Sequence, residues 1–153
     1  MVAAGALRLH VALTQWNREE AIDEAIEHLF PRNLDSPSRA RGWAAPFVAD
    51  ACAAEEGQGA LLVLSELVTN AVRHGDGDVL VTLSCHEDAF VVAVFDEGGG
   101  VVEPRRHDPW ATGGRGLRIV GGLAEKWGVE PSVAGGKTVW ARLATAPRSA
   151  RTR

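Results

Sequence analysis

Two short apolar runs, separated only by a brief polar segment, constrain the fold of this chain most strongly. Residues 79–83 and 90–95 are rich in Val, Leu and Phe, as β-strands are. Because a short turn connects them, we expect two adjacent antiparallel strands. An amphipathic helix that runs to His74 precedes the pair, and its apolar residues recur at helical spacing: Leu61, Leu64, Leu67, Val68, Ala71 and Val72. A helix followed by a hairpin predicts a domain of mixed helices and strands.

The N-terminal part predicts one strand and one helix. Residues 7–13 alternate between apolar and more polar positions, as a half-buried strand does. Asn17 and Glu20 have the spacing of a capping box, and apolar residues at helical spacing follow, so we predict a helix over about 18–29. Phe30 and Pro31 would end this helix.

A second helix is predicted from Ser36, which would act as its N-cap, with Pro37 in the first turn. Pro46 lies inside this helix and is expected to kink or divide it. Residues 55–59 contain two glycines and are predicted to form a turn before the third helix.

The C-terminal third begins with a segment, 98–114, that is rich in Gly and Pro and lacks periodicity. This composition predicts a long mobile loop, and loops of this length usually have a function. A fourth helix is expected over about 116–126, followed by strands near 129–133 and 138–143 and a solvated tail from 146.

Composition narrows the class of protein. A chain of 153 residues fits one domain, and the net charge of −4 argues against binding duplex DNA or an anionic membrane through bulk charge. Cys52 and Cys85 are far apart and lack nearby Cys or His ligands, so neither a disulfide framework nor a zinc site is expected. The absence of a signal-like start or a long apolar run predicts a soluble, cytoplasmic protein.

One face of the third helix groups side chains that can do chemistry. Glu66, Asn70 and either Arg73 or His74 are spaced by three or four residues and therefore share a face. A solvated helix face is the ordinary explanation. The alternative is a catalytic face, because an amide oxygen can complete the shell of a phosphate-bound Mg²⁺ and a carboxylate one turn earlier can polarise a hydroxyl.

Glycines surround the other candidate positions. Asp96 follows a strand directly and is followed by glycines, so it would present a carboxylate to a flat ring, although an ordinary Gly-rich turn is the alternative. The glycines before Leu117 open the fourth helix, whose N–H groups can bind phosphate. The chain has neither a Walker motif nor a GxGxxG motif, so the common nucleotide-binding folds are disfavoured.

The order of four segments, ELVTNAVRH, DEGGG, GGRGL and GGKT, resembles the Bergerat-fold ATPases, the superfamily of gyrase, Hsp90, histidine kinases and MutL. Within it the chain looks most like the bacterial anti-sigma factor serine kinases, whose N-box has the same E-x-x-T-N-A-x-x-H form. The likeness extends over about residues 28–144. It implies a two-layer α+β sandwich with a mixed, largely antiparallel sheet covered on one face by helices. Family members have a short strand near 28–32, where our prediction has mostly helix; we favour helix for 18–27 and allow a short strand near 29–31.

The resemblance also implies roles at the matching positions. Glu66 would be the base on an attacking serine, Asn70 would ligate Mg²⁺, Asp96 would accept from the adenine amine and Thr138 would support Asp96. Residues 101–113 would form the ATP lid. The remaining implied nucleotide contacts are Arg73 and His74 at the edge of the site, Gly98 and Gly100 around adenine, and Gly114, Arg115, Gly116 and Leu117 around the phosphates.

Two functions therefore stay open. One is an ATP-dependent protein-serine kinase that phosphorylates a STAS-type anti-sigma factor antagonist and sequesters a sigma factor; the other is a regulatory module that binds ATP or ADP without catalysis. The resemblance further implies homodimerisation. We expect residues 1–27 to be an extension that either binds a partner or covers an exposed edge or interface, 28–144 to be the ATPase domain and 145–153 to be a flexible tail.

Overall fold

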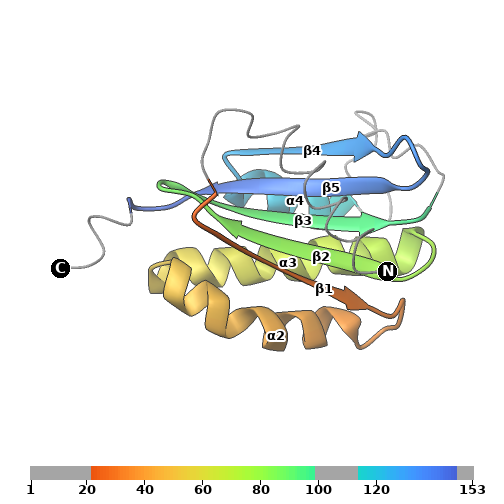
Figure 1. Cartoon of the computed structure of the whole chain (residues 1–153), viewed down its shortest axis with the longest axis horizontal. Helices are drawn as coiled ribbons and strands as arrows, with labels where there is room; N and C mark the ends of the chain where they lie inside the picture. The colour runs from red at the N-terminus through yellow and green to blue at the C-terminus, as the bar shows by residue number, and fades with distance from the viewer. Residues whose placement is uncertain (1–21, 99–113, 148–153) are drawn as a thin grey trace.

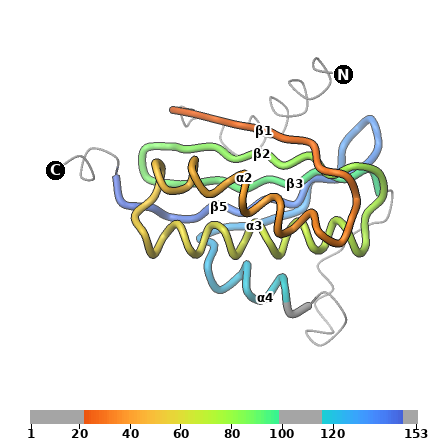
Figure 2. The backbone as a smooth tube through the Cα atoms, turned by 90° about the horizontal axis from the view of Figure 1, so that it is seen from below, coloured from red at the N-terminus to blue at the C-terminus, as the bar shows by residue number. Residues whose placement is uncertain are grey.

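The computed structural model describes residues 22–98 and 114–147, which form one antiparallel sheet with helices on one face (Figures 1 and 2). The strand order is β1-β2-β3-β5-β4, and each of the four neighbouring pairs is antiparallel. This confirms the predicted α+β fold with a largely antiparallel sheet. The described elements are β1 (Glu24–Phe30), α2 (Ser36–Ala51), α3 (Ala54–His74), β2 (Val79–Cys85), β3 (Ala89–Asp96), α4 (Gly114–Leu123), β4 (Lys126–Pro131) and β5 (Lys137–Ala144).

The core lies between the sheet and its helices. Alternate residues of a strand point to the same face, and those facing the helices are buried and apolar. From the helix side, Leu64, Leu67 and Val68 of α3 pack into the same core. The strand residues of this layer include Val79, Val81 and Leu83 of β2, Val92 and Val94 of β3, and Val139 and Ala141 of β5. Asp96 continues this series on β3, so it lies at the helix-facing side of the strand end.

The helix predicted over 18–29 is wrong where the structure describes it. Residues 24–30 form β1, which pairs with β2 from Glu24 opposite Cys85 to Phe30 opposite Val79. Phe30 is buried, and its ring packs edge-on against Trp43 of α2 at a centroid distance of 5.7 Å. Pairing along the whole edge of β2 satisfies the backbone groups on the side of β1 that faces β2, and this tertiary gain outweighs the local helical pattern.

The second helix forms as predicted, with two differences. Ser36 is not the N-cap: it is buried, and its hydroxyl donates to the Pro31 carbonyl at 2.6 Å, while Asp35 precedes the helix. Pro46 does not divide α2, which is continuous over all 16 of its residues. A proline inside a helix costs roughly 3 kcal/mol. Burial of the α2 face that contacts α3 offsets this cost, and its members are Ala40, Ala44, Val48 and Ala51.

The predicted turn at 55–59 is also wrong, because α3 begins at Ala54 and includes these residues. The Glu56 side chain caps the start of the helix. One of its carboxylate oxygens accepts from Ala53 N at 3.0 Å and the other from Ala146 N at 2.7 Å. Gly57 allows α2 to pack closely, since a Cβ there would lie 3.1 Å from a methyl of Val48. The glycine that suggested a turn is therefore a helix-packing position.

The C-terminal elements are present with shifted boundaries. β4 begins at Lys126 rather than near 129, and a tight turn joins it to β5, with Gly135 and Gly136 at φ +97° and +83°. Cys52 and Cys85 are buried as thiols. The predictions for residues 7–13, for most of the 98–114 loop and for the end of the tail lie outside the described residues. In the parts that are described, no helix is long and apolar enough to cross a membrane.

Candidate active site

The C-terminal half of α3 presents the polar face that the sequence predicted. Glu66 and Asn70 are half-buried, one turn apart, while Arg73 and His74 are exposed in the last turn. The opposite side of the helix is packed into the core, so α3 cannot rotate without losing that packing. The Arg73 cation in the last turn also interacts favourably with the negative end of the helix dipole.

Glu66 lies against the first turn of α4. A Cβ built at Gly116 would be 2.7 Å from Glu66 Oε2, so only a glycine leaves room for the carboxylate in this position. The N–H groups at the start of a helix and its dipole favour anions, which include both a carboxylate and a phosphate. The contact thus stabilises the start of α4 and brings a potential base to a potential phosphate site.

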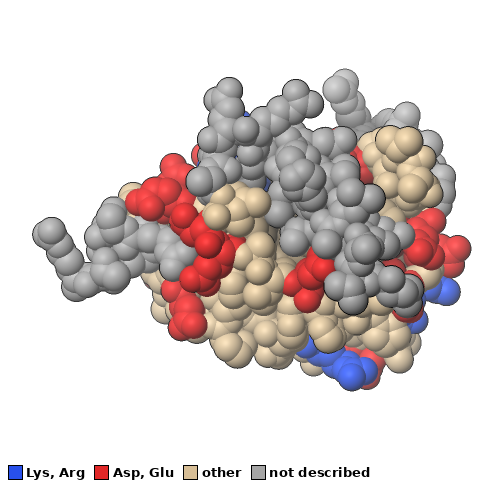
Figure 3. Space-filling view, viewed as in Figure 1, with Lys and Arg blue, Asp and Glu red and all other residues tan. Residues whose placement is uncertain are grey.

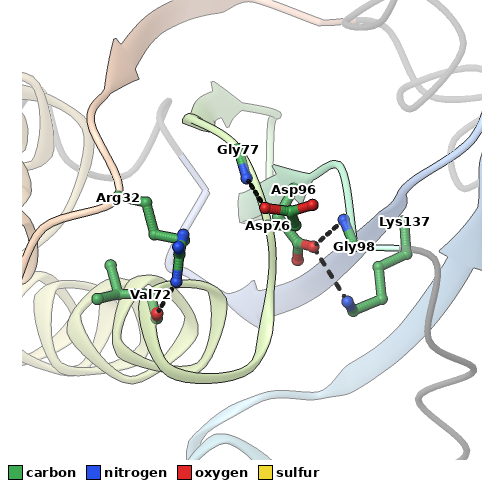
Figure 4. A network of polar contacts seen from close by, with 7 residues as sticks. All are labelled: Arg32, Val72, Asp76, Gly77, Asp96, Gly98 and Lys137. Carbon is green, nitrogen blue, oxygen red and sulfur yellow. Dashed lines mark hydrogen bonds and ion pairs between the residues drawn. The ribbon is translucent and has the colours of Figure 1, made fainter.

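Asp96 ends β3 beside Gly75, which follows the last residue of α3. Its carboxylate is 2% exposed, and Oδ1 accepts from Gly98 N at 2.8 Å and from Lys137 Nζ at 3.1 Å (Figure 4). Asp96 and Lys137 are directly paired in the register of β3 and β5. A buried charge is tolerated when it is paired and hydrogen-bonded, and both conditions hold here.

The turn after α3 holds the helix end beside Asp96. Gly75 N donates to the Ala71 carbonyl at 2.9 Å, and the Asp76 carbonyl accepts from Glu97 N at 2.9 Å. A Cβ at Gly75 would lie 2.7 Å from Asp96 Oδ1. Figure 4 shows this turn next to the Asp96 carboxylate, with Gly77 N bonded to the Asp76 side chain. The ends of α3 and β3 are therefore joined by backbone contacts that need glycine.

Some predicted site residues are brought together and others are not. Glu66 meets Gly116, Asp96 meets Gly98, and Leu117 is half-buried in α4. Thr138 lies opposite Phe95 in the sheet, so its side chain is on the face away from the helices. The position beside Asp96 that was predicted for Thr138 is taken by Lys137. Gly100 and residues 101–113 lie outside the described part, and Gly114 and Arg115 are described only as the backbone that starts α4.

Lys137 and Gly75 are not among the predicted site residues, although both contact Asp96. Lys137 stands in the segment GGKT, but its role depends on strand register, and a shift of one residue exchanges the two faces of a strand. Gly75 lies in the connection between α3 and β2, and only the close approach of Asp96 shows why a glycine is needed there. Knowledge of the β3–β5 register would have identified Lys137, because that register pairs it with Asp96.

The donor set fits a metal ion that arrives with phosphates. Asn70 and Glu66 offer hard oxygens on one helix face, and Mg²⁺ commonly binds to one or two protein oxygens together with substrate phosphates. Within residues 22–98 and 114–147, no three His, Cys, Asp or Glu side chains form a group that could hold a metal alone. Figure 3 shows acidic side chains gathered at both ends of the described surface and basic ones at its lower right edge.

Comparisons with known proteins point the same way. The sequence matches the family described as Histidine kinase-like ATPase domain over residues 30–143. The "Sensor protein IrlS" of Burkholderia pseudomallei (strain K96243) is 31% identical over 135 residues, and the match covers 69% of this chain and 29% of that protein. A crystal structure of the RsbU and RsbW domains of Rv1364c from Mycobacterium tuberculosis has a similar fold, with a TM-score of 0.61 and 17% identity; the match covers 82% of this chain and 34% of that one. The chain thus spans only about a third of the length of either protein.

Proposed function

The chain belongs to the family of histidine kinase-like ATPase domains, and we propose that it binds Mg-ATP along α3 and transfers the γ-phosphoryl group to a protein serine. One observation carries the proposal: a carboxylate lies at each end of the C-terminal half of α3, Glu66 beside the start of α4 and Asp96 beside Gly75. With a helical rise of 1.5 Å per residue, positions 66 and 75 are about 13 Å apart along the axis. That separation is comparable to the length of a nucleoside triphosphate, so base and phosphates can occupy the two ends.

The two ends of the proposed site bind different groups of the nucleotide. We call the end at Asp96 the base end, because it would bind adenine, and the end at Glu66 and the start of α4 the phosphate end. Asp96 accepts from the adenine amine while Gly98 allows the flat ring to approach. The start of α4, from Gly114 to Leu117 and including Arg115, binds the phosphates through its N–H groups. Gly100 would contribute to the base end, and Arg73 and His74 would lie at the edge of the site.

The transfer step needs orientation more than covalent chemistry from the protein. The serine Oγ attacks the γ-phosphorus, its proton goes to the Glu66 carboxylate, and the bond to the leaving ADP oxygen breaks. Asn70 would hold Mg²⁺, and the ion neutralises charge on the phosphates when it is bound.

The proposed substrate is the serine of a STAS-type anti-sigma factor antagonist, with a sigma factor as the second partner and a homodimer as the assembly. The N-box ELVTNAVRH supports this choice, because it has the form found in anti-sigma factor serine kinases. The fold shared with a chain that contains an RsbW domain is compatible with it.

A transfer assay with γ-labelled ATP and purified STAS-domain proteins tests the proposal. We expect label on the STAS protein that survives acid, as phosphoserine does. Label on the kinase chain itself that is lost in acid would indicate a phosphohistidine and contradict the serine assignment. Binding of ATP without any transfer across a panel of STAS domains would favour the non-catalytic regulatory module.

A further inference from the structure

Lys137 is an unusual residue in this chain. The sequence contains two lysines, Lys126 and Lys137; the remaining side chains in its Lys+Arg total are arginines. Among the lysines and arginines that the structure describes, only Lys137 is buried. An ammonium group is strongly hydrated, so its burial is unfavourable without specific partners. Its place at the start of β5 therefore calls for an explanation beyond solubility.

The contacts of the Asp96–Lys137 pair leave hydrogen-bonding capacity on both groups. The bonds from Gly98 N and Lys137 Nζ both end on Oδ1 of Asp96. A carboxylate has two oxygens with about four acceptor directions, so Oδ2 can accept from another donor. An ammonium has three N–H donors, of which one is used by Asp96. The pair can thus accept one hydrogen bond and donate another from adjacent atoms.

Glycines close the space around the Oδ1 side of the pair. A Cβ at Gly98 would lie 2.7 Å from Asp96 Oδ1 and 3.2 Å from Lys137 Nζ, and a Cβ at Gly75 would lie 2.7 Å from the same oxygen. A Cβ at Gly136, whose φ is +83°, would lie 2.4 Å from the Asp96 carbonyl oxygen. Backbone packed this closely fixes both charged groups, so a ligand meets them in one relative arrangement.

This arrangement matches one edge of adenine. The 6-amino group is a donor, and the neighbouring ring nitrogen N1 is an acceptor. We propose that Lys137 is a second base-recognition residue, which donates to N1 while Asp96 accepts from the 6-amino group. The proposal rests on the proposed adenine-nucleotide site and adds to it a direct contact with the ring. The carboxylate alone would read only the amine.

The same pair disfavours guanine. In guanine the group at C6 is an acceptor and N1 carries a proton, so the donor and acceptor are exchanged relative to adenine. Asp96 and Lys137 would have to exchange places to satisfy both, and the hydrogen bond from Gly98 N together with the surrounding glycines holds Asp96 where it is. Lys137 therefore contributes to discrimination between the two purines.

Calorimetric titrations with nucleotide analogues test this inference on the full chain. The ligands are ADP, 1-deaza-ADP, which lacks N1, purine riboside diphosphate, which lacks the amine, and GDP. The proteins are the wild type, Lys137→Met and the control Lys126→Met, whose lysine is exposed on β4. Wild type and Lys126→Met should bind 1-deaza-ADP about tenfold or more weakly than ADP, because a lost bond to a charged donor has this effect.

The Lys137→Met protein should bind ADP and 1-deaza-ADP equally, yet still prefer ADP to the purine riboside diphosphate through Asp96. A merely structural lysine would not change the ratio of the first two ligands. Equal affinity of the wild type for ADP and 1-deaza-ADP, or GDP affinity equal to that for ADP, overturns the inference and leaves the nucleotide site standing. These affinities of the wild type for ADP, 1-deaza-ADP and GDP test the inference even if Lys137→Met does not fold. Failure of the wild type to bind any adenine nucleotide overturns the proposed function and this inference with it.

Discussion

The two ends of the candidate site are built in different ways. At the base end, Asp96 is 2% exposed, paired with Lys137 and surrounded by glycine backbone. At the phosphate end, Glu66 is only half-buried and contacts the first turn of α4 through a side-chain oxygen. One end is fixed by a buried ion pair and close backbone contacts, and the other holds a carboxylate on a flexible stem.

In the proposed function, this difference separates recognition of adenine from the chemistry of phosphoryl transfer. A rigid acceptor and donor suit a base whose shape does not change during the reaction. A carboxylate with some freedom suits a group that must take a proton from an incoming hydroxyl and adjust to its position. Substitutions at the base end should therefore change stability and affinity, whereas substitutions at the phosphate end should change transfer.

The largest expected effect is on catalysis at the phosphate end. Glu66→Gln keeps the shape of the side chain but removes the carboxylate that accepts the serine proton. The rate of phosphoryl transfer should therefore fall by roughly 10²- to 10⁴-fold. Affinity for ADP should stay within about threefold of the wild type, since the base end is untouched. Single-turnover transfer and calorimetry measure the two quantities.

The control for this change is Glu55→Gln, which alters an exposed glutamate in the first turn of the same helix. It should leave both quantities unchanged. Normal transfer by the Glu66→Gln protein would show that the contact with Gly116 only stabilises the start of α4.

The next effect is on stability at the base end. Asp96→Asn leaves the Lys137 ammonium buried without its counter-charge, and breaking one partner of such a pair costs about 3–5 kcal/mol. The double variant Asp96→Asn with Lys137→Met should recover much of this loss, because neither charge then remains. Urea unfolding of the single and double variants gives the comparison.

An exposed ion pair provides the matched control. Asp88 lies 3.4 Å from Arg142, but its side chain is 64% exposed, so Asp88→Asn should cost less than about 1 kcal/mol. Equal unfolding free energies for Asp96→Asn and Asp88→Asn would contradict the view that the base end is fixed by its ion pair.

The sequence predicted much of the fold because most elements have strong local patterns. The α3 face, the β2–β3 hairpin and the order of the later elements follow from periodicity and turn residues. β1 could not be predicted in this way, since its strand form comes from pairing with β2 and from the contact of Phe30 with Trp43. The start of α3 was missed for a related reason, because Gly57 serves the packing of α2 and not a turn.

The candidate site was likewise predictable where local patterns define it, and not where it depends on tertiary contacts. Glu66 and Asn70 share a face by helical spacing, and Asp96 stands at a strand end whose position the apolar run defines. Lys137 was not predictable from composition, since GGKT offers two neighbouring polar side chains, and only the register of β3 and β5 decides which one meets Asp96.

A smaller effect should distinguish two glycines of α4. Gly116→Ala places a methyl group where the Glu66 carboxylate lies, so the carboxylate must move and transfer should fall by about 10- to 100-fold. Gly122→Ala meets nothing within 4 Å and should raise stability by about 0.5–1 kcal/mol with unchanged transfer. The two variants are compared by thermal unfolding and by transfer rate. Equal transfer rates would mean that the position of Glu66 is not important for the reaction.

The most direct test of the central claim is a calorimetric titration of the wild type and Asn70→Ala with ATP, with and without Mg²⁺. The account predicts that the wild type binds ATP and that Mg²⁺ strengthens this binding. It also predicts that Asn70→Ala loses the strengthening while keeping the weaker, metal-free binding, because Asp96 and the start of α4 remain. Absence of ATP binding by the folded wild type, or an equal effect of Mg²⁺ on both proteins, would contradict the assignment of this helix face as a nucleotide site.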